Sequence, residues 1–62
     1  MANVAHLLYV DDRVVAVSPS VETLKDLAQP HIDAGRKVAI RTPEGVMLVY
    51  DRAEATWNEC LP

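Results

Sequence analysis

Apolar residues in this chain recur in short runs, and two aspartates separate the first two of them. Residues 5–10 are rich in large apolar side chains, and a β-branched run over residues 13–17 follows Asp11 and Asp12. Two such runs joined by two turn-forming residues are typical of a β-hairpin. With residues 10 and 13 opposite each other, one face carries Leu8, Val15 and Val17, and the other carries Leu7, Tyr9, Val14 and Ala16.

The period of the pattern changes after this hairpin, from alternation to helical spacing. Ser18 and Pro19 suit the N-cap and the first position of a helix. The apolar stripe that follows at helical spacing consists of Val21, Leu24, Leu27 and Ala28. Pro30 should bend this helix because it lacks a backbone donor, and Gly35 suits the C′ position. We therefore expect one amphipathic helix that ends at Gly35.

A second pair of apolar runs, residues 36–41 and 46–50, flanks a stretch that contains Pro43 and Gly45. Pro and Gly in a short connection favour a tight turn, so these runs predict a second hairpin. We expect residue 41 to lie opposite residue 46. In this register the better core face carries Val38, Ile40, Met47 and Val49, and the other face carries Lys37, Ala39, Arg41, Leu48 and Tyr50.

The C-terminal part of the chain opens with a helix-capping pattern. Asp51 is followed three positions later by Glu54, which resembles a capping box and predicts a short helix through Trp57 and Cys60. The predicted fold class is therefore α+β in the order ββαββα. Two β-hairpins form a small, mainly antiparallel sheet, with one main helix on one face and a short C-terminal helix. No repeat or linker interrupts residues 1–62, which we expect to be a single compact domain.

One amphipathic helix can cover one face of such a sheet, so the second face needs another cover. A contiguous apolar patch is typical of an interaction site. Either the C-terminal segment with Trp57 and Leu61 folds over this face, or another chain does, and a homodimer is the commonest form of the latter. A free strand edge is a further route to association. We expect the partner-binding residues to be Leu7, Tyr9, Leu48, Tyr50 and Arg41.

Residues suited to catalysis or metal binding are scattered along the chain. His6, His31 and Cys60 show none of the close pairings that structural zinc sites use. The Asp11–Asp12 pair is more typical of a turn than of two catalytic carboxylates. The two glycines fit no known phosphate-binding loop. The sequence therefore predicts no enzyme, no metal site and no cofactor.

Composition and charge narrow the class of partner. The net charge of −3, from six Lys and Arg against nine Asp and Glu, opposes non-specific binding to nucleic acid or to an anionic membrane. A single cysteine can form no internal disulfide, which favours a reduced, cytoplasmic setting. No apolar stretch approaches the ~20 residues of a membrane-spanning helix, and the N-terminus lacks the features of a secretory signal.

A basic strip on the second hairpin keeps an alternative open. It consists of Arg36, Lys37, Arg41 and Arg52, and it could meet phosphate or an acidic protein, although such residues also form solvated strand edges. The main hypothesis is a small non-catalytic protein-binding module. It would act as a regulator or inhibitor, by homodimerisation or by capture of a larger protein. The alternative is a nucleic-acid-associated regulator.

Overall fold

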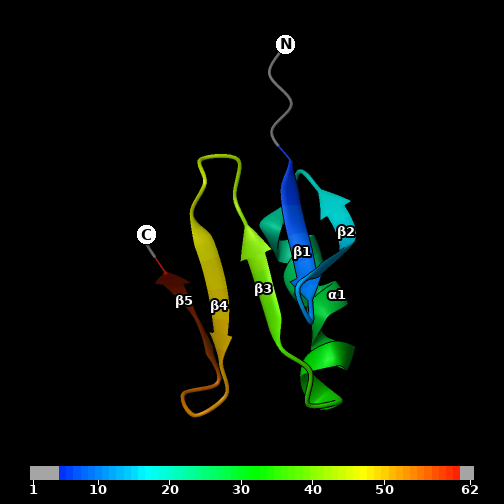
Figure 1. The fold of residues 1–62 in the computed structure, drawn as a ribbon, viewed down its shortest axis with the longest axis vertical. Helices are drawn as coiled ribbons and strands as arrows, with labels where there is room; N and C mark the ends of the chain where they lie inside the picture. The colour runs from blue at the N-terminus through cyan, green and yellow to red at the C-terminus, as the bar shows by residue number, and fades with distance from the viewer. Residues whose placement is uncertain (1–4, 61–62) are drawn as a thin grey trace.

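A computed structural model describes residues 5–60, which form five β-strands and one α-helix (Figure 1). The elements are, in chain order, β1 (His6–Val10), β2 (Arg13–Ser18), α1 (Val21–Asp33), β3 (Val38–Arg41), β4 (Met47–Asp51) and β5 (Thr56–Cys60). The strands form one antiparallel sheet in the order β2-β1-β3-β4-β5. The predicted α+β class with one main helix is confirmed, but a fifth strand stands where a C-terminal helix was expected.

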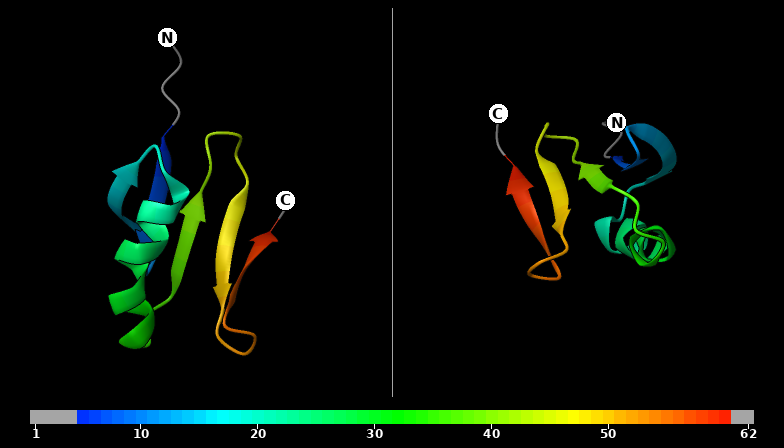
Figure 2. Two further views of the ribbon diagram at one scale, coloured as in Figure 1. Left: turned by 180° about the vertical axis from the view of Figure 1, so that it is seen from behind. Right: turned by 60° about the horizontal axis from the view of Figure 1, so that its bottom comes forward.

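The helix lies on one face of the sheet and covers only part of it. Both β2 and β3 are antiparallel to β1, so they run in the same direction, and α1 connects them across β1. Within the described chain, α1 contacts β1, β2 and β3, and the β4–β5 hairpin extends beyond the helix (Figure 2). We call the side of the sheet that carries α1 the helix face and the opposite side the open face.

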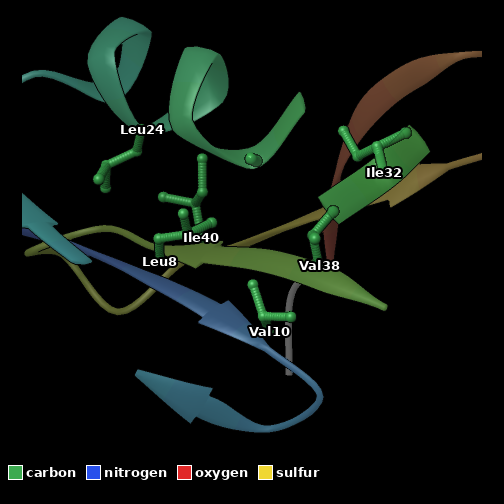
Figure 3. Packing of buried hydrophobic residues seen from close by; sticks show 7 residues of the cluster. Leu8, Val10, Leu24, Ile32, Val38 and Ile40 are labelled. Atoms are coloured by element: carbon green, nitrogen blue, oxygen red, sulfur yellow. The ribbon is translucent and has the colours of Figure 1, made fainter. Parts of the chain in front are cut away.

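The hydrophobic core lies between α1 and the strands β1 and β3. Leu8, Leu24 and Ile40 are fully buried at its centre (Figure 3). Four further buried residues complete the cluster: Val10, Ala28, Ile32 and Val38. Five half-buried residues pack at its margin: Ala16, Val21, Leu48, Tyr50 and Trp57. The burial of apolar area that stabilises this fold is therefore concentrated under the helix.

The helix begins two residues later than predicted. Its N-cap is Ser20, whose hydroxyl accepts a hydrogen bond from the Thr23 N–H at 3.4 Å. Ser18 instead ends β2, where its hydroxyl accepts from the Ser20 N–H at 3.1 Å. The helix continues through Pro30 to its last turn, and Gly35 follows with a left-handed φ of +82°, as its predicted C′ role requires.

The first hairpin has the predicted pairing at its turn but a different register farther along. Asp11 and Asp12 both have left-handed backbones, with φ of 52° and 68°, which suits a two-residue hairpin turn. An irregularity in the β1–β2 ladder then places Leu8 opposite Ala16, where Val15 was expected. Because one extra residue of β2 is accommodated here, the small Ala16 packs beside the core and Val15 remains half exposed.

The second hairpin pairs one residue away from the predicted register. Arg41 lies opposite Met47 and not opposite Val46. The Gly45 N–H donates to the Thr42 carbonyl at 2.9 Å and the Thr42 N–H donates to the Val46 carbonyl at 2.8 Å, so the loop contains three residues and not four. Gly45 supplies the left-handed φ, +91°, that such a loop needs. A slip of one residue moves every β4 side chain to the other face.

The capping pattern at Asp51 forms a turn and not a helix. One Asp51 carboxylate oxygen accepts hydrogen bonds from the N–H groups of Ala53 and Glu54, at 2.9 and 3.3 Å, as an N-cap would. Ala55 then adopts a left-handed φ of 55°, and the chain returns alongside β4 as β5. The Asn58 side-chain amide donates to the other Asp51 oxygen at 3.3 Å. The prediction of a C-terminal helix is therefore wrong.

Candidate protein-binding face

The open face is lined by side chains that the strand register aligns in two rows. The first row consists of Tyr9, Ala39, Val49 and Asn58, with Val14 at its β2 end. The second row consists of Val17, Leu7, Arg41, Met47 and Cys60. Residues directly opposite each other in an antiparallel pair project to the same side, so both rows lie on one surface. Within residues 5–60, no other element packs on this surface.

A hollow of about 700 Å³ lies in the middle of the open face. It forms because the small side chain of Ala39 stands between the larger side chains of Tyr9 and Val49 on the neighbouring strands. One end of the hollow is bounded by Asp12 and Lys37, whose side chains form an exposed ion pair at 3.8 Å. The lining is therefore mainly apolar, with polar groups at its margin.

Arg41 is the charged group placed among the apolar side chains of the open face. It is exposed, and it lies between Leu7 on β1 and Met47 on β4. Within the described residues, its guanidinium forms no ion pair and no hydrogen bond. An arginine in this position is available to an acidic group from outside, because its planar fork matches a carboxylate.

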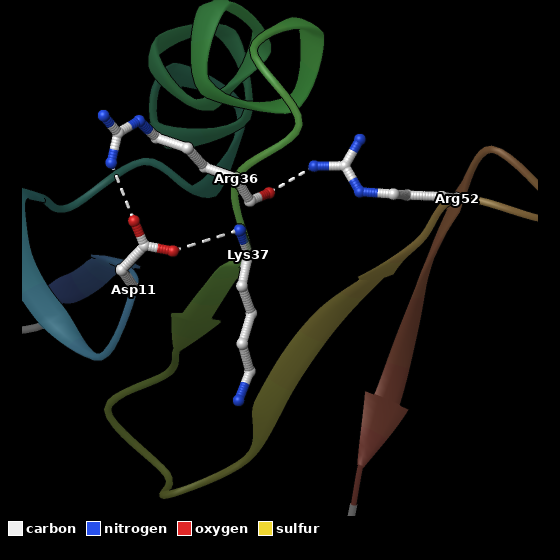
Figure 4. Close-up of polar contacts among 4 residues, drawn as sticks. All are labelled: Asp11, Arg36, Lys37 and Arg52. Carbon is white, nitrogen blue, oxygen red and sulfur yellow. Dashed lines mark hydrogen bonds and ion pairs between the residues drawn. The ribbon is translucent and has the colours of Figure 1, made fainter.

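The other three residues of the basic strip make contacts within the protein, Arg36 and Arg52 through their guanidinium groups and Lys37 through its backbone N–H (Figure 4). Arg36 donates to the Asp11 carboxylate at 2.8 Å, and Asp11 also accepts from the Lys37 N–H at 3.4 Å. Arg52 donates to the carbonyl oxygens of Ile32, at 2.7 Å, and of Arg36. These contacts fasten the connection between α1 and β3 to the turns on either side of it. They give Arg36 and Arg52 a structural role, and the nucleic-acid alternative stays a prediction.

The structure divides the predicted partner-binding residues between the two faces. Leu7, Tyr9 and Arg41 lie on the open face, as expected. Leu48 and Tyr50 lie on the helix face, where they pack against the core, because Leu48 is opposite the buried Ile40. The expectation that all five share one face is therefore wrong, and the cause is the three-residue loop of the second hairpin.

The C-terminal strand does not cover the open face. Trp57 lies opposite Tyr50 on the helix face, and the two rings meet edge to face with centroids 5.4 Å apart. Leu61, the other residue expected to cover this face, lies outside the described residues. Met47 and Val49, which the predicted register assigns to the core, take part in the open face instead. The available signal for this register was the pair Pro43 and Gly45, which are separated by one residue and therefore fit a three-residue loop.

The residues considered for catalysis or metal binding lie on separate elements. His6 is at the start of β1 with a buried Nδ1 that makes no hydrogen bond in the described structure, whereas Cys60 is exposed at the end of β5. His31 is in the last turn of α1. Among the described residues, no group of three His, Cys, Asp or Glu side chains is arranged to hold a metal ion. In the same part of the chain, no helix has the length and apolar character to span a membrane.

Comparison with protein-family models, curated proteins and solved structures identified no match for this chain. The function is therefore inferred from the geometry of the open face.

Proposed function

We propose that this protein is a small, non-catalytic module that binds another protein through the open face of its sheet. The observation that supports this proposal is the hollow over Ala39 with Arg41 beside it, which has no ion-pair partner among residues 5–60. A contiguous apolar surface with one available charge is typical of a protein-recognition site. By occupying a surface of a larger protein, such a module would act as a regulator or an inhibitor.

The chemistry of the face defines the kind of segment that it fits. The hollow between Tyr9 and Val49 suits a projecting apolar side chain of the partner. Arg41 suits a carboxylate next to that side chain, from an acidic residue or from a chain terminus. Because the hollow is a shallow depression in a sheet surface, it suits a protein segment better than a small substrate, which an enzyme would largely enclose.

The single cysteine of the chain is consistent with a reducing compartment. Cys60 is a free thiol and is exposed at the edge of the open face. An exposed free thiol persists where glutathione and thioredoxin keep cysteines reduced. We therefore place the proposed binding activity in the cytoplasm.

Position-specific cross-linking tests the proposal. A photoreactive amino acid is introduced at Met47 on the open face or at Asp26 on the exposed side of α1, and cells that naturally make the protein are irradiated. We expect a discrete cross-linked protein from position 47 and none from position 26. Equal patterns from both positions would contradict binding through the open face.

Two further substitutions establish whether the hollow and the charge are recognised. Ala39→Val fills the hollow with a residue that suits strands, and Arg41→Glu reverses the charge. Each should reduce the yield of the Met47 cross-link at least tenfold, whereas Gln29→Glu on the exposed side of α1 should leave it unchanged. Circular dichroism serves as the control that each variant is folded. Undiminished cross-linking by both open-face variants would rule out the proposed recognition.

A further inference from the structure

The exposed apolar side chains of this protein gather at one edge of the molecule. Within residues 5–60, four large hydrophobic residues are exposed by about half: Val14, Val15, Val17 and Leu27. Three of them are on β2, which is an edge strand of the sheet. Such an edge presents unpaired backbone groups as well as side chains.

Leu27 belongs to the flank of α1 that borders β2. His31, one helical turn farther along the same flank, lines a shallow hollow of about 500 Å³ together with Val15 and Arg13 of β2. Leu27 therefore continues the apolar surface of β2 from the sheet layer into the helix layer. The edge therefore has exposed apolar side chains in both layers of the fold.

Charged groups are confined to one end of this edge, where Arg13 lies beside the Asp11–Arg36 ion pair. After Arg13, β2 contains no charged residue, and the exposed neighbours of Leu27 on its flank are Thr23, Pro30 and Ala34. The acidic residues of the helix are Glu22, Asp26 and Asp33, and they lie about 100° or more around the helix axis from Leu27. A chain with a net charge of −3 can thus approach a copy of itself here without bringing carboxylates together.

The opposite edge of the sheet has a different chemistry. There β5 exposes Thr56, Asn58 and Glu59, next to a turn that contains Arg52 and Glu54. Addition of β2 to β5 of a neighbouring molecule would join an apolar edge to a polar one and would continue without limit. Pairing of β2 with β2 joins like surfaces and closes after two chains.

We propose that two copies of this chain associate through β2, antiparallel to each other, about a two-fold axis perpendicular to the sheet. The ten strands then form one sheet with both helices on the same side of it. Leu27 of each copy faces the axis, and antiparallel pairing keeps the two Arg13 side chains at opposite ends of the interface. The β2 edge meets the open face at Val14 and Val17, but no residue of β2 lines the hollow over Ala39. This association therefore does not depend on the function proposed for that hollow.

A second copy explains the edge better than an added peptide strand does. A peptide strand would extend the sheet layer and cover the valines, but it would leave Leu27 in the helix layer exposed. A second copy brings a helix together with its strand and covers both layers. The irregularity near Val15 shortens the regular part of the β2 ladder, so burial of these side chains supplies much of the attraction.

Sedimentation equilibrium of the full chain, from low to high micromolar concentration, tests this proposal. We expect the mass of a dimer for the wild type and the mass of a monomer for Leu27→Glu, since this substitution places two carboxylates at the axis. Gln29→Glu adds the same charge on the exposed side of α1 and should sediment as the wild type does. Met47→Glu on the open face should also remain dimeric, which separates this interface from the proposed partner site.

Disulfide trapping provides an independent measurement of the geometry. In a Cys60→Ser background, Leu27→Cys should form a covalent dimer on mild oxidation, whereas Gln29→Cys should not. A wild-type protein that remains monomeric at high micromolar concentration would overturn the proposal. So would a dimer that Leu27→Glu leaves intact, because association would then use another surface.

Discussion

Left-handed backbone conformations at three non-glycine residues shape two turns of this protein. Asp11 and Asp12 form the β1–β2 turn, where the Asp11 carboxylate accepts hydrogen bonds from Arg36 and from the Lys37 N–H. Aspartate tolerates this conformation because its short polar side chain bonds nearby groups. Ala55, which ends the turn between β4 and β5, has no such compensation.

Replacement of Ala55 by glycine should stabilise the protein. An L-residue with a side chain is disfavoured at a φ of 55° by about 1 kcal/mol or more, and glycine adopts this value freely. The greater freedom of glycine in the unfolded chain offsets part of the gain. We expect Ala55→Gly to raise the free energy of unfolding by about 0.5 kcal/mol, measured by urea denaturation.

The matched control for this substitution lies in the same turn. Ala53 is exposed and does not have a positive φ, so Ala53→Gly should leave stability unchanged or lower it slightly. A loss of stability in both variants would show that the backbone at position 55 is unstrained in solution.

One residue in a loop determined how well the binding face could be predicted. The sequence indicated both runs of the second hairpin and the turn between them, but apolar side chains occur at every position from Val46 to Tyr50. Alternation therefore could not distinguish the two registers. The three-residue loop closed by Gly45 decided between them, and it moved Leu48 and Tyr50 to the core. Leu7, Tyr9 and Arg41 were placed correctly, since the pairing of β1 with β3 did not depend on that loop.

At the scale of elements, the helix was predicted in its position and nearly in its extent. Its apolar stripe was placed too far to one side, because Leu27 was included and Ile32 was not. The observed core stripe is Leu24, Ala28 and Ile32, at steps of four residues. Helical spacing admits both stripes, and the position of β1 under the helix selects one of them.

The C-terminal strand was missed because its first signal is ambiguous. A carboxylate that accepts from two following N–H groups begins a helix or a turn equally well. At Asp51 the signal begins a turn, after which Trp57 and Tyr50 pair across β4 and β5. Cross-strand packing thus overrides the local capping pattern.

The guanidinium of Arg52 connects the β4–β5 hairpin to the end of the helix. It donates to the Ile32 carbonyl at the helix C-terminus and to the Arg36 carbonyl in the following connection. We expect Arg52→Ala to lower the free energy of unfolding by about 1 kcal/mol, a modest value because the residue is exposed. Chemical denaturation monitored by Trp57 fluorescence measures this loss.

Hydrogen exchange locates the effect of the Arg52 substitution. In Arg52→Ala, the exchange of β5 amides should increase by more than the loss of global stability alone would cause. The reason is that β5 pairs with β4 alone and Arg52 restrains the turn between them. Amides of β1, which lies between two strands under the helix, should follow the global change. Arg41→Ala removes a charge without these contacts and should leave β5 unaffected. Equal exchange of β5 in the wild type and Arg52→Ala would show that this contact does not restrain the hairpin.

Within residues 5–60, the single helix does not cover every apolar surface of the sheet. One helix of 13 residues buries the centre of the sheet but leaves the open face and the β2 edge accessible. A domain of about 60 residues buries a limited fraction of its surface and is often only marginally stable as a monomer. The sequence indicated that one helix is too little to cover both faces of the sheet. The location of the uncovered surfaces depended on the register and on the strand order.

Self-association through β2 should make the thermal stability of this protein depend on its concentration. When unfolding also separates two chains, each tenfold increase in concentration adds about 0.7 kcal/mol per chain, which is half of RT ln 10. In a domain of this size, the Tm should then rise by about 3–6 °C per tenfold increase. Leu27→Glu should remove this dependence, because position 27 is exposed in the single chain and faces the proposed axis in the dimer. Calorimetry of both proteins over a wide concentration range measures the difference, and a wild-type Tm that does not change with concentration would show that the chain folds and unfolds alone.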